Sequence, residues 1–358
     1  MSNFMIYGAN GYTGRIITQM AAERGLKPLL CGRNEAAISA LAAKYKLPYA
    51  VCDLSNKAAL DDAVLSVDAV LHCAGPFSRT TTPMLESCIR TKTHYLDITG
   101  ELEVFEKIAR QDIFIAQGGI TAMPGVGFDV VPTDCLAAYL KKRLPTATHL
   151  TLAFVGLGGG VSHGTATTML ENTGKGGAIR LNGNITPIPN GSKTKMVTFD
   201  KKPVETVCIP WGDVSTAYYS TKIPNIEVYT VFPSMMKRVM AGGAVSWLLT
   251  NWLSKKLLQR FLNGFVDGPS EKQRANAKSI VWGQVSDENG NIATARLLTP
   301  EGYTLTALTA LAAVEKVLQG KGKLGFQTPS MAFGENFVTE IKGVVRQDLH
   351  QKTEVKVQ

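Results

Sequence analysis

The sequence predicts an α/β protein in which an N-terminal, doubly wound parallel sheet is followed by a second, α+β domain with a mixed or antiparallel sheet. Short apolar runs alternate with helical stretches over the first 75 residues, and the strand patterns after about residue 150 alternate more loosely. The composition is 45% hydrophobic and 19% charged, which excludes a disordered or collagen-like chain. A chain of 358 residues exceeds what one core usually supports, so we expect two domains.

The early elements follow one another at short intervals. The predicted strands are Phe4–Tyr7, Pro28–Cys31, Tyr49–Cys52 and Ala69–Cys73, and the helices between them are Gly14–Glu23, Glu35–Tyr45 and Ala58–Leu65. A helix over Thr82–Thr91, a strand over His94–Ile98, a helix from about Glu101 and an apolar segment over Ile120–Met123 come next. Strands separated by helices of this length predict parallel pairing with right-handed crossovers.

The residue pattern in the second half of the chain predicts strands with looser alternation of apolar and polar residues. They are Thr148–Val155, Thr194–Phe199, Ile226–Phe232, Ser279–Val285 and Ile292–Leu298. The last two flank residues 287–291, which tolerate positive φ and therefore predict a hairpin. We place the first domain at residues 1–134 and the second at residues 135–324.

Charge and cysteine content limit the classes of partner. Thirty-eight basic and 29 acidic residues give a formal charge of +9, spread along the chain without the dense clusters that bind nucleic acid. The six cysteines form no C-x-x-C pair and the N-terminus has no signal peptide, so we expect free thiols and a cytoplasmic location. The five histidines lack zinc-like spacing, and we expect no metal site.

A glycine-rich turn at the N-terminus gives the strongest functional signal. It consists of Gly8, Ala9, Asn10, Gly11, Tyr12, Thr13 and Gly14, between a predicted strand and a predicted helix. Gly8 permits a sharp turn, Gly11 lets a pyrophosphate approach the backbone, and Gly14 lets helix and strand pack closely. The unpaired N–H groups and the positive dipole end of the helix suit phosphates. The turn therefore predicts a Rossmann-type dinucleotide site formed by Gly8, Asn10, Gly11, Tyr12, Thr13 and Gly14.

The end of the second strand indicates which dinucleotide binds. Arg33 and Asn34 stand there, nineteen residues after Gly14, where NAD sites usually carry an acidic residue. A guanidinium can form two hydrogen bonds with a 2′-phosphate and stack on adenine. We therefore predict NADP(H) as the cofactor. The alternative is a solvated arginine at the start of a helix.

Two further strand ends belong to the predicted cofactor site. Asp53 and Leu54 follow the third strand, where side chains commonly flank adenine. As an alternative, Asp53 or Ser55 caps the next helix. The fourth strand ends in small residues suited to lie against the sugar and pyrophosphate, namely Ala74, Gly75, Pro76 and Phe77.

These motifs together resemble the saccharopine dehydrogenase-like oxidoreductases, in particular the group that contains trans-acting enoyl reductases. The resemblance rests on Gly8–Gly14, Gly32–Asn34, Ala74–Phe77, Tyr95–Glu101, Pro124–Asp134, Ser162–Thr165, Gly268–Ser270 and Gly325–Pro329. It implies a Rossmann domain completed by about residues 325–350, a second domain on a mixed sheet, and NADP-dependent reduction. The family covers imine chemistry as well as double-bond reduction of lipid intermediates.

The candidate catalytic residues follow the fifth and sixth strands. Tyr95 and Asp97 share one face of a strand, where they can position a proton donor; alternatively, Asp97 or Thr99 caps the helix near Glu101. Asp129 ends a tight Pro-Gly segment that can lie close to a nicotinamide, or it fixes the turn. His163 begins a helix and can donate a proton near neutral pH, or it is an ordinary packing histidine.

Two segments of the second domain allow more than one interpretation. Tyr218 and Lys222 have the Y-x-x-x-K spacing of short-chain reductases, but residues 216–223 are rich in β-formers and we interpret the spacing as coincidence. Residues 233–265 are apolar and basic with helical spacing. Such a helix can form a lid, a membrane-facing surface, a dimer face or an ordinary core contact. We favour a lid or membrane-facing helix, and we expect a homodimer.

The leading hypothesis is an NADP(H)-dependent oxidoreductase that transfers hydride to an apolar or lipid-like enoyl substrate. The alternatives are an imine or amino-acid reductase of the saccharopine type and a non-catalytic NADP(H)-sensing module. The imine reductase would need a carboxylate clamp, for which we consider Arg180, Arg274 and Arg296 of the second domain.

Overall fold

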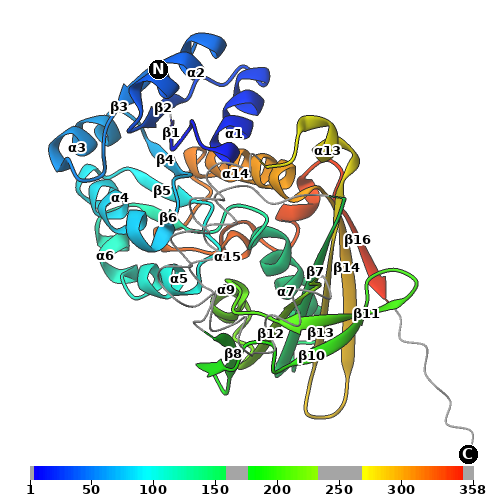
Figure 1. The fold of residues 1–358 in the computed structure, drawn as a ribbon. Helices are drawn as coiled ribbons and strands as arrows, with labels where there is room; N and C mark the ends of the chain where they lie inside the picture. Colours follow the sequence, from blue (N-terminus) through cyan, green and yellow to red (C-terminus); the bar gives the residue numbers. More distant parts are fainter. Residues whose placement is uncertain (1–3, 159–175, 233–267, 350–358) are drawn as a thin grey trace, which may run out of the picture.

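The computed structural model describes residues 4–158, 176–232 and 268–349 (Figure 1). Within these residues the chain forms two sheets, and Figure 1 shows the N-terminal elements on one side and the long strands of the second sheet on the other. The predicted residues Ser162–Thr165, including His163, and the segment 233–265 lie outside the described ranges. Within these ranges, no helix is long and apolar enough to cross a membrane.

Sheet A is a 7-stranded parallel sheet in the order β15-β6-β5-β4-β1-β2-β3. Its strands are β1 (Phe4–Tyr7), β2 (Leu29–Gly32), β3 (Tyr49–Val51), β4 (Ala69–His72), β5 (His94–Asp97), β6 (Thr121–Met123) and β15 (Gly325–Phe326). Its connecting helices are α1 (Tyr12–Glu23), α2 (Glu35–Tyr45), α3 (Lys57–Leu65), α4 (Phe77–Thr91), α5 (Leu102–Ala109) and α6 (Asp112–Gln117). Every residue of β1 and β4 is buried because helices cover both faces. The predicted doubly wound sheet is confirmed.

The strand order fixes where a ligand can bind. The order in which successive strands are added to the sheet reverses between β1 and β4, which pair in parallel from Phe4 opposite Ala69 to Tyr7 opposite His72. In open parallel sheets ligands bind beyond the carboxyl ends of the strands at such a switch point. The glycine turn after β1 and the loop after β4 therefore border the expected site.

Sheet B is mixed, because β7 pairs parallel with β12 and antiparallel with β13. Its main path is β10-β11-β12-β7-β13-β14-β16, with β8 and β9 alongside. The bounds are β7 (His149–Leu157), β8 (Gly177–Leu181), β9 (Asn184–Ile188), β10 (Thr194–Thr198), β11 (Pro203–Cys208), β12 (Asn225–Thr230), β13 (Lys278–Ser286), β14 (Ile292–Pro300) and β16 (Val345–Leu349). The predicted hairpin between β13 and β14 is confirmed, with Gly290 at φ +80° in its turn. The strands β8, β9, β11 and β16 were not predicted.

The remaining helices lie between and beside the sheets. They are α7 (Val131–Arg143), α9 (Asp213–Thr221), α13 (Glu271–Asn276), α14 (Gly302–Leu318), α15 (Pro329–Phe333) and the 3₁₀ helix η1 (Phe337–Glu340). Although residues 216–223 are rich in β-formers, Thr216 to Thr221 belong to helix α9. The helix buries Val214 and Ala217 against α7, so packing overrides the local preference.

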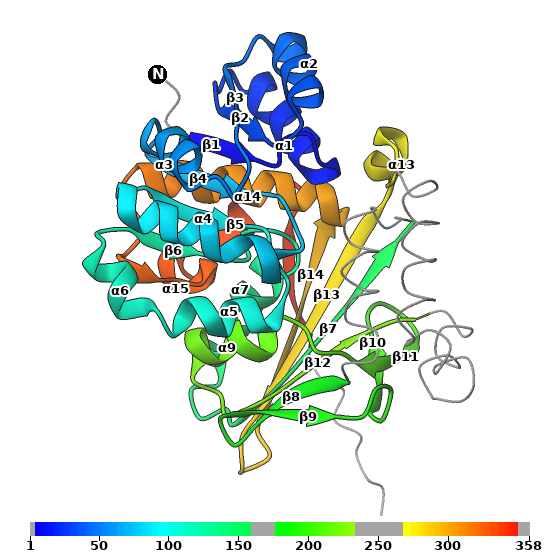
Figure 2. The same cartoon turned by 60° about the vertical axis from the view of Figure 1, so that its left-hand side comes forward.

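Two elements pack across the predicted division at residues 134 and 324. Helix α14 packs against α1, β4 and β5, although its sequence lies in the range assigned to the second domain (Figure 2). Strand β16 pairs with β14 of sheet B, although it lies in the range expected to complete the first domain. Strand β15 does extend sheet A by pairing with β6. One hydrophobic core accordingly runs from sheet A through α14 and α7 to sheet B.

Candidate cofactor site and active site

The glycine turn after β1 is held tightly against its neighbours. Gly8 has φ +80°, and a Cβ atom on it would lie 2.8 Å from the Cβ of Ala74 in the loop after β4. A Cβ on Gly14 would lie 2.3 Å from the carbonyl oxygen of Gly8. The structure thus contains the sharp turn at Gly8 and the close helix packing at Gly14 that the sequence predicts.

The N-terminus of α1 is open. Gly11 is the N-cap in an extended conformation, no side chain caps the helix, and no acidic residue stands in the first turn. Gly11 is exposed, and a Cβ there would approach the Gly8 carbonyl oxygen only to 3.2 Å. Since the first N–H groups of a helix need partners from outside the helix, this terminus suits an anionic group such as a pyrophosphate.

Arg33 and Asn34 follow β2 on the same edge of the sheet, and both side chains are exposed. The Asn34 side chain caps α2 by accepting a hydrogen bond from the Ala37 N–H at 3.1 Å. Arg33 stands immediately before this cap, beyond the end of the strand. The structure therefore gives Asn34 a local structural role and leaves Arg33 beside the expected adenosine position.

Asp53, predicted beside the adenine, does not take the alternative role of capping helix α3. Its Oδ1 accepts hydrogen bonds from the backbone N–H and the hydroxyl of Ser55, at 2.9 and 2.6 Å, and these bonds lower the pKa of the carboxyl. Helix α3 is capped by Asn56, which accepts from the Ala59 N–H. The expectation that Asp53 or Ser55 caps this helix is wrong; Asp53 and the half-buried Leu54 instead stand at the strand end next to Arg33.

The loop after β4 is fixed at both ends. The hydroxyl of Thr80 donates to the Ala74 carbonyl at 2.7 Å. Glu101 accepts hydrogen bonds from the N–H groups of Phe77 and Ser78, at 2.7 and 2.9 Å. Helix α4 therefore starts at Phe77, five residues before the predicted Thr82, and its N-terminus is occupied by a carboxylate from this chain.

The side chains of Tyr95 and Asp97 lie on one face of β5, as predicted, but both are buried inside the protein. The Tyr95 hydroxyl donates to Asp97 Oδ2 at 2.6 Å, and both residues have no exposed surface. Asp97 Oδ1 accepts from the N–H groups of Thr99 and Gly125, each at 2.9 Å. Burial raises the pKa of Asp97 to about 6. This pair ties the loops after β5 and β6 together, and neither Asp97 nor Thr99 caps α5.

Asp129, in the loop between β6 and α7, is half-buried at the same edge of sheet A. A Cβ atom on Gly100 would lie 2.7 Å from Asp129 Oδ2, so the carboxyl rests against the loop after β5. The Asp129 carbonyl accepts a hydrogen bond from Trp211 Nε1 at 2.7 Å. Burial raises the pKa of Asp129 to about 7, so the carboxyl can hold a proton near neutral pH.

Three half-buried aromatic side chains stand beside Asp129. The rings of Phe128 and Phe154 lie 5.8 Å apart between centroids, and those of Phe154 and Trp211 lie 4.8 Å apart. Phe128 lies in the predicted Pro124–Asp134 motif, whereas Phe154 and Trp211 lie in none of the predicted motifs. Phe154 lies on β7 and Trp211 precedes α9, so only the packing of sheet B against the loop after β6 brings them to this place.

Comparison with known proteins shows similarity to one family over part of the chain. Residues 4–123 match the family model of the saccharopine dehydrogenase NADP binding domain. A saccharopine dehydrogenase-like oxidoreductase of Rattus norvegicus is 27% identical over 220 residues, which cover 53% of this chain and 51% of that protein. Over these ranges the chain is similar to saccharopine dehydrogenase-like oxidoreductases. The resemblance predicted from the motifs is confirmed, and with it a nicotinamide dinucleotide as cofactor.

Further relatives carry two different names. A trans-acting enoyl reductase of Mycobacterium ulcerans (strain Agy99) is 28% identical over 153 residues, covering 39% of this chain and 35% of that protein. The solved apo structure of a histidine-tagged saccharopine dehydrogenase (L-Glu forming) from Saccharomyces cerevisiae covers 98% of this chain and 100% of its own, with a TM-score of 0.67 and 14% identity. That likeness concerns the fold alone. The chain spans about half the length of the first curated relatives it matches, or less.

The three second-domain arginines considered for a carboxylate clamp all have hydrogen-bond partners within the protein. Arg180 donates to the carbonyls of Val214 and Gly183 and to Glu106. Arg296 donates to Gln347 and to the Phe199 carbonyl, and Arg274 donates to Tyr12 and to the Pro269 carbonyl.

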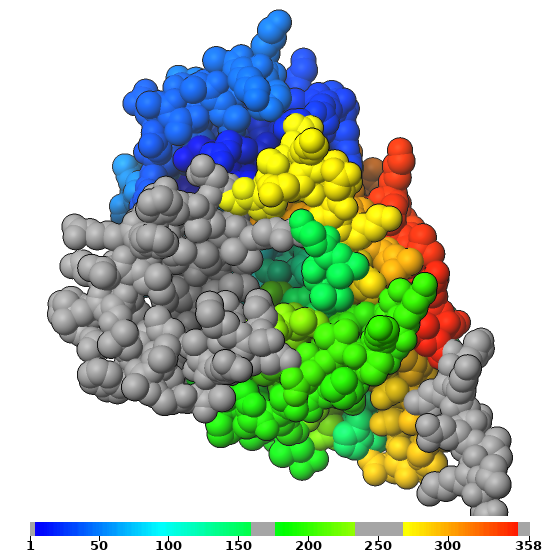
Figure 3. Space-filling view, turned by 45° about the vertical axis from the view of Figure 1, so that its right-hand side comes forward, coloured from blue at the N-terminus to red at the C-terminus, as the bar shows by residue number. Residues whose placement is uncertain are grey.

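Tyr12 of the glycine turn contacts the second half of this chain rather than projecting freely. Its hydroxyl donates to the Pro269 carbonyl, and a Cβ on Gly268 would lie 2.6 Å from its ring. Figure 3 shows the segment that carries α13, in yellow, lying directly against the blue N-terminal domain. The sequence predicted Tyr12 as a cofactor residue, and the structure shows that its side chain joins the glycine turn to residues 268–274.

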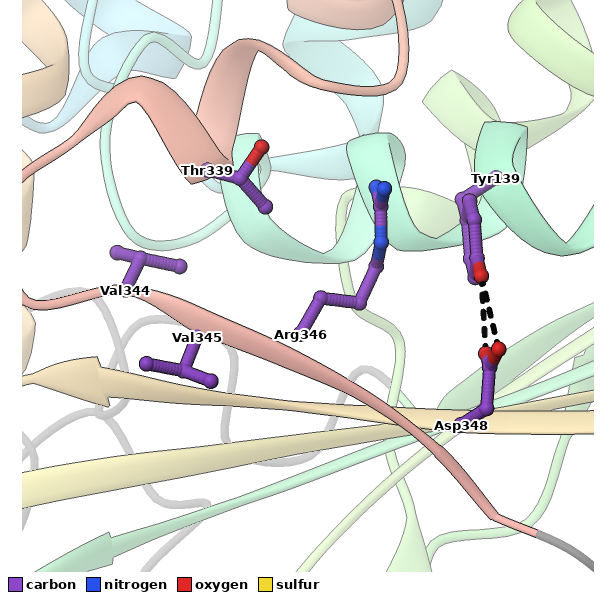
Figure 4. A pocket seen from close by; sticks show the side chains of 6 residues that line it. All are labelled: Tyr139, Thr339, Val344, Val345, Arg346 and Asp348. Atoms are coloured by element: carbon purple, nitrogen blue, oxygen red, sulfur yellow. Dashed lines mark hydrogen bonds between the residues drawn. The ribbon is translucent and has the colours of Figure 1, made fainter.

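A separate hollow lies between α7, η1 and β16 (Figure 4). The Tyr139 hydroxyl donates to Asp348, and the Arg346 guanidinium lies 3.6 Å from the centroid of the Tyr139 ring. None of the predicted cofactor or catalytic residues lines this hollow, so it is no part of the candidate active site.

Proposed function

We propose that this protein is an NADP(H)-dependent oxidoreductase that transfers hydride to an apolar, lipid-like enoyl substrate. The proposal rests mainly on one observation: the uncapped N-terminus of α1 stands at the switch point of a parallel sheet, one strand away from the exposed Arg33. The backbone N–H groups after Gly11 would hold the pyrophosphate, and Arg33 would hold the 2′-phosphate of the adenosine ribose.

The loop after β4 would bind the nicotinamide half of the cofactor. Glu101 and Thr80 fix the residues Ala74 to Phe77 beside Gly8, so their backbone is in place before the ligand arrives. NADPH, when bound, supplies the hydride. The protein must exclude water around the acceptor and provide a proton.

The surroundings of Asp129 suit an apolar acceptor. Trp211 donates a hydrogen bond to the backbone carbonyl of Asp129, the rings of Phe128, Phe154 and Trp211 pack in sequence beside this residue, and the carboxyl retains its proton up to about pH 7. We assign Asp129 as the proton donor to the α-carbon of the enoyl group once hydride has reached the β-carbon. The buried pair of Tyr95 and Asp97 would position the loops behind it.

An imine or amino-acid substrate is less well supported. Recognition of an amino-acid carboxylate usually relies on a free arginine with two aligned N–H groups. Arg180, Arg274 and Arg296 are engaged with groups of the protein itself. The relatives named enoyl reductase are a second reason to test unsaturated acyl substrates first.

The cofactor assignment is tested by Arg33→Asp. We expect NADPH affinity, measured by isothermal calorimetry, to fall at least about tenfold, because a hydrogen bond to a charged group contributes about 1.5–3 kcal/mol. NADH should then bind as well as NADPH or better, since an acidic residue at this strand end suits a ribose hydroxyl. Arg110→Asp, an exposed arginine after α5, is the charge-matched control. Unchanged affinity for both dinucleotides in Arg33→Asp would refute the assignment.

The reaction is tested by NADPH consumption at 340 nm with long-chain enoyl thioesters, their saturated counterparts and saccharopine-type imines. Turnover with enoyl substrates alone supports the proposal, turnover with imines alone replaces it with the imine reductase, and tight NADPH binding without any turnover identifies a sensing module.

We also propose a homodimer and a peripheral membrane contact through residues 233–265. Light scattering tests the homodimer, and liposome flotation tests the membrane contact.

A further inference from the structure

Two cysteines stand at the cofactor edge of sheet A, one on each of two paired strands. Cys31 is the third residue of β2, and Cys52 follows the last residue of β3. The strands run parallel, with Cys31 opposite Ala50, and the Cys52 N–H donates to the Gly32 carbonyl at 3.2 Å. The two Sγ atoms lie 3.1 Å apart, and both residues are buried, with 0% and 4% of their surface exposed.

The backbone of both cysteines holds the residues that start the glycine turn. The Cys31 carbonyl accepts hydrogen bonds from the N–H groups of Gly8 at 2.8 Å and Ala9 at 3.3 Å. The Cys52 carbonyl accepts one from the Tyr7 hydroxyl at 3.2 Å. A shift of either cysteine would therefore move the turn directly.

We propose that Cys31 and Cys52 form a reversible disulfide that distorts the glycine turn and weakens dinucleotide binding. The effect on binding rests on the proposed NADP(H) site; the disulfide itself does not. The modification is an oxidation of two thiols, and the class of oxidant is a hydroperoxide.

The chemistry balances with the peroxide as the sole co-reactant. The Cys52 sulfur attacks one peroxide oxygen, the O–O bond breaks, and a sulfenic acid and one water result from hydrogen peroxide. The Cys31 sulfur then attacks the Cys52 sulfur, the S–O bond breaks, and the second water leaves. Two thiols lose two electrons and two protons in total, and the peroxide is reduced to two waters.

The local environment favours this order of attack. The hydrogen bond between the two thiols lowers the pKa of Cys52 and raises that of Cys31, so Cys52 is the more readily deprotonated partner. A thiolate is the reactive form of cysteine. Cys52 is also the one followed by an exposed residue, Asp53, at the open edge of the sheet.

Formation of the Cys31–Cys52 disulfide requires the two side chains to move. A disulfide has a sulfur separation of about 2.05 Å, so the two side chains must approach by about 1 Å. The carbonyl of Cys31 and the strand end at Gly32 move with them, next to Arg33. Because binding and modification are thermodynamically linked, a bound dinucleotide should in turn slow the oxidation.

The experiment uses the full-length protein, reduced and then treated with hydrogen peroxide. Unreacted thiols are alkylated under denaturing conditions, and intact mass and peptide mapping report the bridge. We expect a Cys31–Cys52 disulfide, an NADPH dissociation constant raised at least about fivefold, full recovery with dithiothreitol, and slower oxidation of the NADPH-saturated protein.

Three variants make the test specific. Cys31→Ala and Cys52→Ala should bind NADPH when reduced and should show no peroxide-induced loss of affinity. Cys88→Ala, which removes another buried thiol, should behave as wild type. If a single-alanine variant fails to fold, the wild-type mass and affinity measurements still decide.

The possible results of the peroxide experiment distinguish failure of the disulfide proposal from failure of the proposed function. Peroxide treatment that yields no Cys31–Cys52 bridge overturns the proposal, as does a bridge that leaves NADPH affinity unchanged. If the reduced wild type binds no dinucleotide, the proposed function fails, and the mass measurement still reports separately whether the bridge forms.

Discussion

Two aspartates lie beyond neighbouring strands of sheet A, and their surroundings give them different properties. Asp97 accepts three hydrogen bonds, from Tyr95, Thr99 and Gly125, and has no exposed surface. Asp129 is half-buried beside three aromatic rings, and its pKa is raised to about 7 by burial. A fully partnered carboxylate holds loops in place, whereas a partly exposed carboxyl that keeps its proton near neutral pH can give that proton away.

Asp129→Asn should lower turnover by at least about a hundredfold while leaving the NADPH dissociation constant unchanged, because only proton donation is lost. In the wild type, turnover should fall above about pH 7, where Asp129 loses its proton.

The free energy of unfolding should also depend on the protonation state of Asp129. The pKa in the folded protein is raised from 3.8 to about 7, so the folded state binds more protons between these values, and stability decreases as pH rises through that window.

Melting temperatures between pH 4 and pH 8 measure this effect, and the decrease should be smaller in Asp129→Asn. Asp97→Asn serves as the comparison: it should lower the melting temperature at pH 7 because it disturbs three buried hydrogen bonds. A variant Asp129→Asn with full turnover and an unchanged pH profile would remove this residue from the mechanism.

The helices that follow β1 and β4 start at the same edge of sheet A, but their N-termini differ. Helix α4 receives the carboxylate of Glu101, which crosses from the loop after β5. Helix α1 has no side-chain cap and no acidic residue in its first turn. A carboxylate already satisfies the helix dipole of α4, so in the proposed complex the phosphates of a dinucleotide would bind at α1.

Glu101→Ala tests the cap on α4. Two N–H groups lose their acceptor, and we expect the free energy of unfolding in urea to drop by about 1–2 kcal/mol. NADPH affinity should fall as well, because the loop from Ala74 to Phe77 loses its anchor. Glu103→Ala, on the exposed side of α5, removes the same charge without breaking either hydrogen bond. Equal stability of the two variants would contradict the capping role.

The two sheets form one body, held by a shared hydrophobic core and by a buried ion pair. Arg180 on β8 donates to Glu106 on α5 at 2.9 Å, and the arginine side chain is 5% exposed. Ser215 of α9 donates to the same carboxylate oxygen at 2.6 Å. The guanidinium also lies 4.2 Å from the centroid of the Tyr218 ring. Arg180 thus joins sheet B to a helix of the first domain, and a substrate clamp is not its role.

Glu106→Ala should destabilise the protein by about 3–5 kcal/mol in urea unfolding, because it leaves the buried Arg180 charge without its partner. The pair of Lys142 and Glu335 provides the control, since its lysine side chain is 70% exposed and pairs with a solvent-exposed partner contribute about 0–1 kcal/mol. If Glu106→Ala lowered the free energy of unfolding no more than Glu335→Ala, the Arg180–Glu106 ion pair would not be what holds sheet B against the first domain.

Local sequence signals were sufficient to predict those features whose backbone conformation depends on neighbouring residues. The spacing of Gly8, Gly11 and Gly14 predicted the turn and the close helix packing, and the alternation of apolar runs with helices predicted sheet A. The hairpin between β13 and β14 followed from its turn residues alone. In these places backbone conformation depends on neighbouring residues, and the sequence displays them side by side.

Other features depend on contacts between distant parts of the chain. Glu101 extends α4 to Phe77, Phe154 and Trp211 gather at Asp129, Arg180 pairs with Glu106, and α9 is a helix in spite of its β-formers. No periodicity marks these residues, because each owes its role to a partner brought near by the folding of the whole chain. The linear order thus determined the glycine turn and the architecture of the first domain, whereas three-dimensional packing decided which carboxyls are exposed, which arginines are engaged and what surrounds Asp129.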